Sequence, residues 1–173
     1  MQPGDNFLPW YNWQLIKFLR GYLRPEMDVF EYGIGRSTLF YAQRTKLVHS
    51  TETRTEWIEF VQDNARTLGL SNIKILPCDD VRKFPEGIAH FGQQYDIIII
   101  DSYERMKCLT QSFACLKPNG ILILDNSERG NLKDAPSIAG QHGLNILHKF
   151  CDIGPHRSGI SEAIVFLNPP PTL

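Results

Sequence analysis

Four consecutive isoleucines at positions 97–100 constrain the fold more than any other segment of the chain. A strand with one face in water alternates apolar and polar residues, whereas a strand covered on both faces is apolar throughout. Residues 95–102 are therefore predicted to form a central strand, with helices packed on both faces of its sheet. A second apolar run, residues 121–124, likewise ends at polar residues, an Asp-Asn pair.

Strand-like runs alternate with segments of helical spacing along most of the chain. Helices are predicted over residues 11–23, 36–45, 53–70 and 104–116. Strands are predicted over residues 27–32, 46–52, 72–77, 95–102 and 121–126, and two further strands over residues 145–150 and 162–167. Strands that alternate with helices form right-handed βαβ units and a parallel sheet. The segment joining the last two strands is too short and too rich in glycine and proline for a crossover helix, so these two strands are predicted to pair antiparallel.

The predicted fold class is α/β, with a Rossmann-like seven-stranded and mostly parallel sheet, helices on both faces, and an antiparallel C-terminal strand pair. A chain of 173 residues suits one domain. We assign this domain to residues 1–168, with an N-terminal helix or lid over residues 1–24, and predict a disordered tail over residues 169–173.

Composition argues against several classes of partner. The formal net charge of -1 gives no electrostatic reason to expect nucleic acid or an anionic membrane. The N-terminus does not read as a secretory signal, and no apolar run approaches the roughly 20 residues that span a bilayer. These features predict a cytoplasmic protein that binds a small molecule, and they leave the oligomeric state open.

Polar residues follow the predicted strands at the edge of the sheet where open α/β folds bind ligands. They are Glu31, Gly33 and Gly35 after the first strand, Glu52 after the second, Asp79 and Asp80 after the third, Asp101 after the fourth, and Asp125 and Asn126 after the fifth. Carboxylates at the ends of five apolar strands are hard to explain by packing alone. Two structural alternatives remain open: Glu31 as an acceptor for backbone N–H groups, and the glycines as parts of a tight turn.

The segment from Gly33 to Thr38 distinguishes between nucleotide-binding motifs. A nucleoside-triphosphate loop needs GxxxxGK[ST], but Phe30 stands at its first glycine and Arg36 at its lysine. A dinucleotide motif needs a third glycine, whose place Thr38 takes. A GxG turn followed by an acidic residue about twenty positions later, here Glu52, favours an adenosine-type ligand.

Together these residues resemble the class I S-adenosylmethionine-dependent methyltransferases. The first motif of that family, an acidic residue, a spacer and GxG, is matched by "EYGIG" at residues 31–35, and the likeness covers residues 29–167. Three segments, "LPW", "VFEYGIGRST" and "DNSERG", resemble a group of small bacterial members of the class. The resemblance implies S-adenosylmethionine as the cofactor.

The resemblance also implies roles for matching residues. Glu31, Gly33 and Gly35 would line the methionine end of the cofactor, and Glu52 would accept both ribose hydroxyls. Asp79, or else Asp80, would meet the adenine amino group, and Asp101 would lie near the cofactor's amino group or the transferred methyl. The predicted cofactor-binding set is completed by Ser37 and Thr38, at the start of the following helix.

Asp101 and Asp125 are the predicted catalytic residues. Together with Asn126 they also match, in part, the catechol-type O-methyltransferases, which hold a divalent cation with an Asp after the fourth strand and an Asp-Asn pair after the fifth. Three oxygen ligands would suit Mg²⁺. The lysine of those enzymes is missing, because Glu104 and Arg105 stand near its place.

The sequence thus predicts a methyltransferase that uses S-adenosylmethionine and acts on an unidentified small molecule. Alternatives are a metal-dependent enzyme of catechol type, a cofactor-binding protein without transferase activity, and a nicotinamide-dinucleotide oxidoreductase. Trp10, Tyr11 and Trp13 are interpreted either as an aromatic lid over the cofactor or as an anchor of the first helix.

Overall fold

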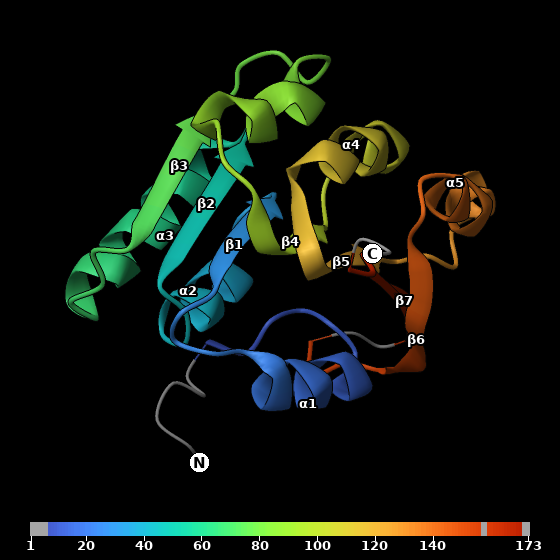
Figure 1. Ribbon diagram of the computed structural model, residues 1–173. Coiled ribbons are helices and arrows are strands. Elements are labelled where there is room, and N and C mark those ends of the chain that lie inside the picture. Colours follow the sequence, from blue (N-terminus) through green and yellow to red (C-terminus); the bar gives the residue numbers. More distant parts are fainter. Residues whose placement is uncertain (1–6, 157–158, 171–173) are drawn as a thin grey trace.

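The computed structural model describes residues 7–156 and 159–170. Residues 1–6 of the predicted lid segment and residues 171–173 of the predicted tail lie outside the described residues. The fold is a seven-stranded sheet in the order β3-β2-β1-β4-β5-β7-β6, which confirms the predicted class (Figure 1).

The strands and helices alternate as predicted. The strands are β1 (Asp28–Tyr32), β2 (Leu47–Glu52), β3 (Ile73–Pro77), β4 (Tyr95–Ile100), β5 (Leu116–Asp125), β6 (Asn145–Ile153) and β7 (Ile160–Leu167). The α-helices are α1 (Trp13–Tyr22), α2 (Arg36–Ala42), α3 (Thr55–Thr67), α4 (Arg105–Ser112) and α5 (Ala135–Gln141). Short 3₁₀ helices are η2 (Phe84–Phe91), η3 (Phe113–Cys115) and η4 (Gly130–Leu132).

The four isoleucines of β4 divide between the two faces of the sheet, because successive side chains of a strand point to opposite sides. Ile97 and Ile99 pack with α1 and α2, whereas Ile98 and Ile100 pack with η2, α4 and α5. All four are fully buried. In Figure 1, α1 and α4 lie on opposite sides of the central strands. The prediction of a strand covered on both faces is confirmed.

The C-terminal strand pair is also confirmed. β6 and β7 pair antiparallel, and β7 inserts beside β5, again antiparallel, while the pairs among β1 to β5 are parallel. β7 is therefore buried between two neighbours, and β6 forms one edge of the sheet.

The largest differences from the predicted boundaries lie at the end of α4 and the start of β5. The predicted helix over residues 104–116 ends earlier, as α4 followed by η3, and β5 begins at Leu116 instead of residue 121. Pro118, Asn119 and Gly120 lie within β5 where its register with β4 shifts between Tyr95 and Ile97, and Asn119 has a φ of 62°. The segment before β4 holds the helix η2, which the sequence did not predict.

The chain reverses its order in the sheet between β1 and β4. From β1 it runs outward through β2 to β3, and then returns to place β4 on the other side of β1. Such a switch point opens a crevice between the loops that follow the two strands. Within the described residues, no helix has both the length and the apolar character needed to cross a membrane.

Candidate functional site

A cavity of about 460 Å³ lies at this switch point. Its volume falls within the range of small-molecule sites, about 300–1,000 Å³. The lining comes from the loops after β1, β2, β4 and β5 and from Trp10, which precedes α1. Of the residues predicted to form the site, five lie on its wall: Gly33, Gly35, Ser37, Glu52 and Asp101.

Gly33 allows the loops after β1 and β4 to meet. Its φ of 87° lies in the left-handed region, and its N–H donates to the carbonyl of Thr51, 3.0 Å away. A Cβ at this position would lie 2.8 Å from the backbone oxygen of Asp101. A side chain here would therefore both strain the backbone and push Asp101 away from β1.

Glu31 lies beneath the cavity, not on its wall. Its side chain is 1% exposed, and one carboxyl oxygen accepts from the Thr38 hydroxyl at 2.6 Å. The other oxygen accepts from the Tyr11 hydroxyl at 3.3 Å. The Thr38 hydroxyl oxygen in turn accepts from the N–H of Gly35 at 2.9 Å. Thr38 thus connects Glu31 to the glycine turn, and the donors to Glu31 are side-chain hydroxyls instead of the backbone N–H groups of the structural alternative.

Burial governs the protonation of Glu31. It raises the pKa of this carboxyl from 4.5 to about 8, although hydrogen bonds from Ser37, Thr38 and Tyr11 favour the charged form. The negative charge of Asp101 adds to the rise. A carboxyl with this pKa carries a proton at neutral pH.

Glu52 ends β2 and reaches the cavity wall while remaining 5% exposed. Its Oε1 accepts from the backbone N–H groups of Thr53 and Arg54 at 2.7 and 2.9 Å, and its Oε2 accepts from that of Ile34 at 3.1 Å. This carboxylate therefore connects the glycine loop to the loop after β2. Because a carboxylate oxygen has about two acceptor sites, Oε2 keeps capacity for a further donor.

Asp101 is held by a buried arginine, Arg105. Nη2 of Arg105 lies 2.8 Å from Oδ1 of Asp101 and 3.0 Å from Oδ1 of Asn126. Its Nε donates to the backbone oxygen of Asp125 at 3.1 Å, and its Nη1 donates to that of Ser102. Four of the five N–H groups of the guanidinium are thus engaged by the protein.

The backbone is strained at two neighbours of Arg105, one adjacent in the sequence and one that it contacts in space. Glu104 has a φ of 48° and Asn126 a φ of 58°, both in the left-handed region that residues other than glycine seldom adopt. Glu104 immediately precedes α4 and Asn126 immediately follows β5. Glu104 itself lines the cavity, and the turn at Asn126 leads into the loop that holds Arg129 and Asn131, which also line it. Such strain is frequent where a fold positions a functional group.

The residues proposed for Mg²⁺ do not fit a metal centre. The Arg105 guanidinium bonds to Asp101, to Asn126 and to the backbone of Asp125, so a cation already lies among the three predicted ligands. A divalent ion beside this guanidinium would meet a like charge at close range. Within residues 7–156 and 159–170, no group of three His, Cys, Asp or Glu side chains could hold a metal ion.

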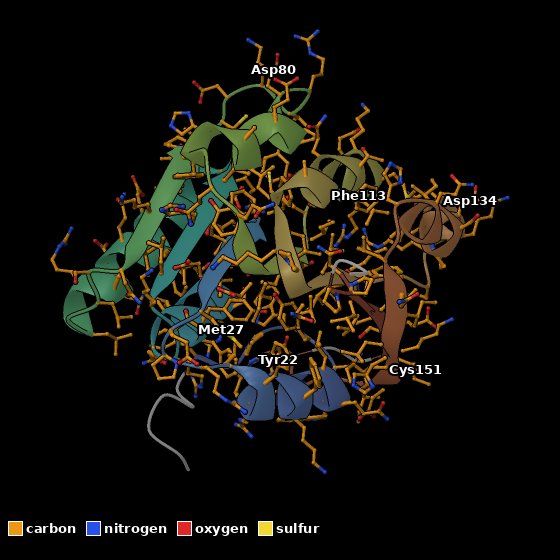
Figure 2. All side chains as sticks on the ribbon, in the orientation of Figure 1. Tyr22, Met27, Asp80, Phe113, Asp134 and Cys151 are labelled. Atoms are coloured by element: carbon orange, nitrogen blue, oxygen red, sulfur yellow. The ribbon has the colours of Figure 1, made fainter. Side chains whose placement is uncertain are left out.

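Asp79, Asp80 and Asp125 do not line the cavity. Asp80 pairs with Arg82, whose hydrogen bonds lower the Asp80 pKa to about 2, and Figure 2 shows Asp80 on the loop beyond β3. Asp79 is exposed next to it. Asp125 is fully buried, and its backbone oxygen accepts from Nε of Arg105. The adenine role of Asp79 or Asp80 and the catalytic role of Asp125 stay predictions.

The aromatic residues before α1 divide between the two interpretations. Trp10 lines the cavity, is 46% exposed, and meets Trp57 of α3 edge to face at 5.8 Å. Tyr11 is fully buried. The Asn12 side chain caps α1 by accepting from Leu15 N–H, and donates to the Ser161 carbonyl of β7. Trp10 thus has the place of a lid residue, and Tyr11 and Asn12 anchor the helix.

Comparison with known proteins identifies solved structures of similar fold. No family model and no curated protein matches the chain. Solved structures do match, among them an rRNA methylase from Streptococcus thermophilus, with 14% identity, a TM-score of 0.66, and 88% of this chain and 93% of that chain covered. The chain has a Rossmann-like methyltransferase fold. The N-methyltransferase NodS from Bradyrhizobium japonicum is similar at 16% identity and a TM-score of 0.63, over 90% of this chain and 93% of that one.

The methyltransferase fold is not confined to one reaction. A precorrin 8W decarboxylase from Methanobacterium thermoautotrophicum matches with 21% identity and a TM-score of 0.68, covering 89% of this chain and 87% of that chain. Identities this low show the fold alone. These similarities do not support the resemblance to the catechol-type O-methyltransferases, and the contacts of Arg105 explain why the metal site implied by it is not formed.

Sequence reasoning did not assign several residues on the cavity wall. They include Arg54, Trp57, Tyr103 and Asn131. Arg105 is only 9% exposed, so it is not a solvated surface charge. The four-residue spacing of Asp101 and Arg105 is not a helical signal, because Asp101 precedes α4, which begins at Arg105.

Proposed function

We propose that this protein is an S-adenosylmethionine-dependent methyltransferase. The observation that carries the proposal is the cavity at the switch point of a methyltransferase fold, with Glu52 and the Gly33–Gly35 turn on its wall. A carboxylate at the end of the second strand is suited to a ribose, because its oxygens accept hydrogen bonds from hydroxyl groups.

Residues of the wall would hold the cofactor in defined ways. Glu52 keeps acceptor capacity on Oε2 for a ribose hydroxyl, and the backbone at Gly35 is bare where a ligand would approach. Ser37, at the start of α2, lies on the same wall. Asp101 offers a carboxylate, fixed by Arg105, to the cationic part of the ligand.

The cofactor supplies a methyl group already activated by a sulfonium, so the protein has to align the acceptor and exclude water. Trp10 and Trp57 meet over one side of the cavity and reduce access of solvent. If the acceptor atom is protonated, Asp101 is the base that we favour, because its carboxylate lies on the wall while Asp125 is buried. We retain a small molecule as the acceptor because the net charge of -1 provides no general attraction for a polynucleotide.

Calorimetric titration with S-adenosylhomocysteine tests the proposal. Wild-type protein should bind it, and Glu52→Ala should weaken binding by about 1–3 kcal/mol, because hydrogen bonds to the ribose are lost. Glu52→Gln keeps one acceptor oxygen for the neighbouring N–H groups, and it controls for collapse of the loop. Glu59→Ala is the matched control, because Glu59 is an exposed residue of α3 that does not line the cavity.

The outcome separates the alternatives. If wild type does not bind the ligand at high micromolar concentration, or if Glu52→Ala and Glu59→Ala behave alike, the proposed cofactor site is wrong. Tight binding of NADH in its place would favour the oxidoreductase. Binding of S-adenosylhomocysteine without methyl transfer to any class of acceptor would favour a cofactor-binding protein.

A further inference from the structure

Two arginines converge on one amide oxygen at the cavity. Oδ1 of Asn126 accepts from Nη2 of Arg105 at 3.0 Å and from Nη2 of Arg129 at 3.2 Å. Asn126 is held in the left-handed region, and a turn after it returns Arg129, whose N–H donates to the Asn126 carbonyl at 3.2 Å. The fold therefore places two positive charges within hydrogen-bonding reach of a single atom.

The carboxylates nearby compensate one of these charges. Asp101 pairs with Arg105 at 2.8 Å. Glu104, also on the wall, pairs with Lys107 at 2.7 Å, and Glu128 accepts from the N–H of Glu162. Among the described residues, no carboxylate lies within ion-pair distance of Arg129. Two like charges at this separation repel each other unless an anion lies between them or beside them.

Arg129 lies among residues that line the cavity. Arg129 and Asn131 both line the cavity, and Arg129 is exposed, so its guanidinium can be reached from solvent. Tyr103, 52% exposed, contributes an accessible ring to the same cavity. Arg105 has one N–H left after its contacts with the protein, whereas the only side-chain hydrogen bond of Arg129 to the described residues is the one to Asn126.

We propose that the methyl acceptor is a small molecule with a carboxylate or phosphate group, and that Arg129 binds this group. Arginine suits both anions because its planar fork donates two parallel hydrogen bonds. Asn131, a neutral donor on the same wall, would add to the contact without another charge. That the anion belongs to a methyl acceptor rests on the proposed function. The binding of an anion by Arg129 does not.

Three probes test the charge requirement directly: benzoate, phenyl phosphate and the uncharged analogue benzamide. Trp10 and Trp57 line the cavity, so quenching of tryptophan fluorescence reports binding. Each probe is titrated with and without saturating S-adenosylhomocysteine. We expect benzoate or phenyl phosphate to bind at least tenfold more tightly than benzamide, and the stronger of the two identifies the anion.

Variants assign the effect to Arg129. Arg129→Gln should weaken binding of the anionic probes at least tenfold and leave benzamide unchanged, and Arg129→Lys should retain part of the affinity as a point charge. Arg66→Gln is the control, because Arg66 is an exposed residue that pairs with Asp63 on α3. Its titration curves should match those of wild type.

Three results would overturn the assignment: benzamide binding as tightly as benzoate, Arg129→Gln binding the anions as wild type does, or polyuridylate binding more tightly than either small anion. Failure of the cofactor proposal is recognised separately, since S-adenosylhomocysteine binding is measured by calorimetry. Anion binding through Arg129 without cofactor binding would support the anion site and refute the proposal that the protein is a methyltransferase.

Discussion

Replacing Glu31 with glutamine should remove a large pH dependence from the stability of the protein. Glu31 is 1% exposed, and its hydrogen-bond donors are the hydroxyls of Ser37, Thr38 and Tyr11. Burial raises its pKa from 4.5 to about 8. Between these two pH values the folded state holds a proton that the unfolded state has released.

The sign follows from proton linkage. A carboxyl whose pKa is raised by folding contributes stability that is fully present below pH 4.5 and is lost as the pH rises through about 8. The free energy of unfolding of wild type should therefore fall across this window. Glutamine resembles the protonated carboxyl in shape and carries no titrating proton, so Glu31→Gln should lack this fall.

The expected magnitude follows from the two pKa values. Each pKa unit is worth about 1.4 kcal/mol, so the stability difference between wild type and variant should change by about 3 kcal/mol between about pH 5.5 and about pH 8.5. His49 also adds to the pH dependence, because burial lowers its pKa from 6.5 to about 4 in the folded state. This contribution is the same in both proteins and cancels in the difference. Urea unfolding followed by tryptophan fluorescence at several pH values gives this difference.

Glu86→Gln provides the matched control, since Glu86 is an exposed carboxylate on η2. Its stability should follow that of wild type at every pH. If the curves of wild type and Glu31→Gln stay parallel from about pH 5.5 to about pH 8.5, Glu31 does not hold a proton in the folded state, and the account of the buried carboxyl is refuted.

Two further results are expected. Gly33→Ala should lower the free energy of unfolding, measured in urea, by about 2 kcal/mol or more. The reason is that its Cβ would strain a left-handed backbone and lie 2.8 Å from the Asp101 backbone oxygen. Gly130→Ala is the control and should not lower it, because there is open space around Gly130. Excess EDTA should leave S-adenosylhomocysteine binding and any methyl transfer unchanged, because Arg105 supplies the cation among the predicted ligands; a loss of activity that Mg²⁺ restores would contradict this.

The sheet could be predicted from the sequence because its signals are local. Four isoleucines can be buried in a row only in a strand covered on both faces, and the short connection before β7 excludes a crossover helix. The errors occurred where a long-range contact competes with a local signal. Pro118, Asn119 and Gly120 are typical turn residues, but pairing with β4 continues on both sides of them, so they form an irregular segment inside β5.

The site could be predicted only in outline. The ends of parallel strands converge, so Glu52, Gly33 and Asp101 could be placed near one another before their contacts were known. Whether a carboxyl faces the cavity or the core depends on side-chain packing, and this is why Glu31 lies below the wall and Asp80 lies with Arg82. No motif distinguishes these cases, since each is an acidic residue just at or beyond a strand end.

Arg105 has the largest effect on how the site is interpreted. In the sequence, Asp101, Asp125 and Asn126 are three oxygen donors, and three oxygen donors suggest a metal ion. A metal ion could also bind the acceptor, because its waters exchange for substrate oxygens, whereas the Arg105 guanidinium has four of its five N–H groups engaged by the protein. Arg105 can therefore fix Asp101 but has little capacity left to bind a substrate. Recognition of an acceptor anion then falls to the neighbouring guanidinium of Arg129, which shares the Asn126 oxygen and is exposed at the cavity.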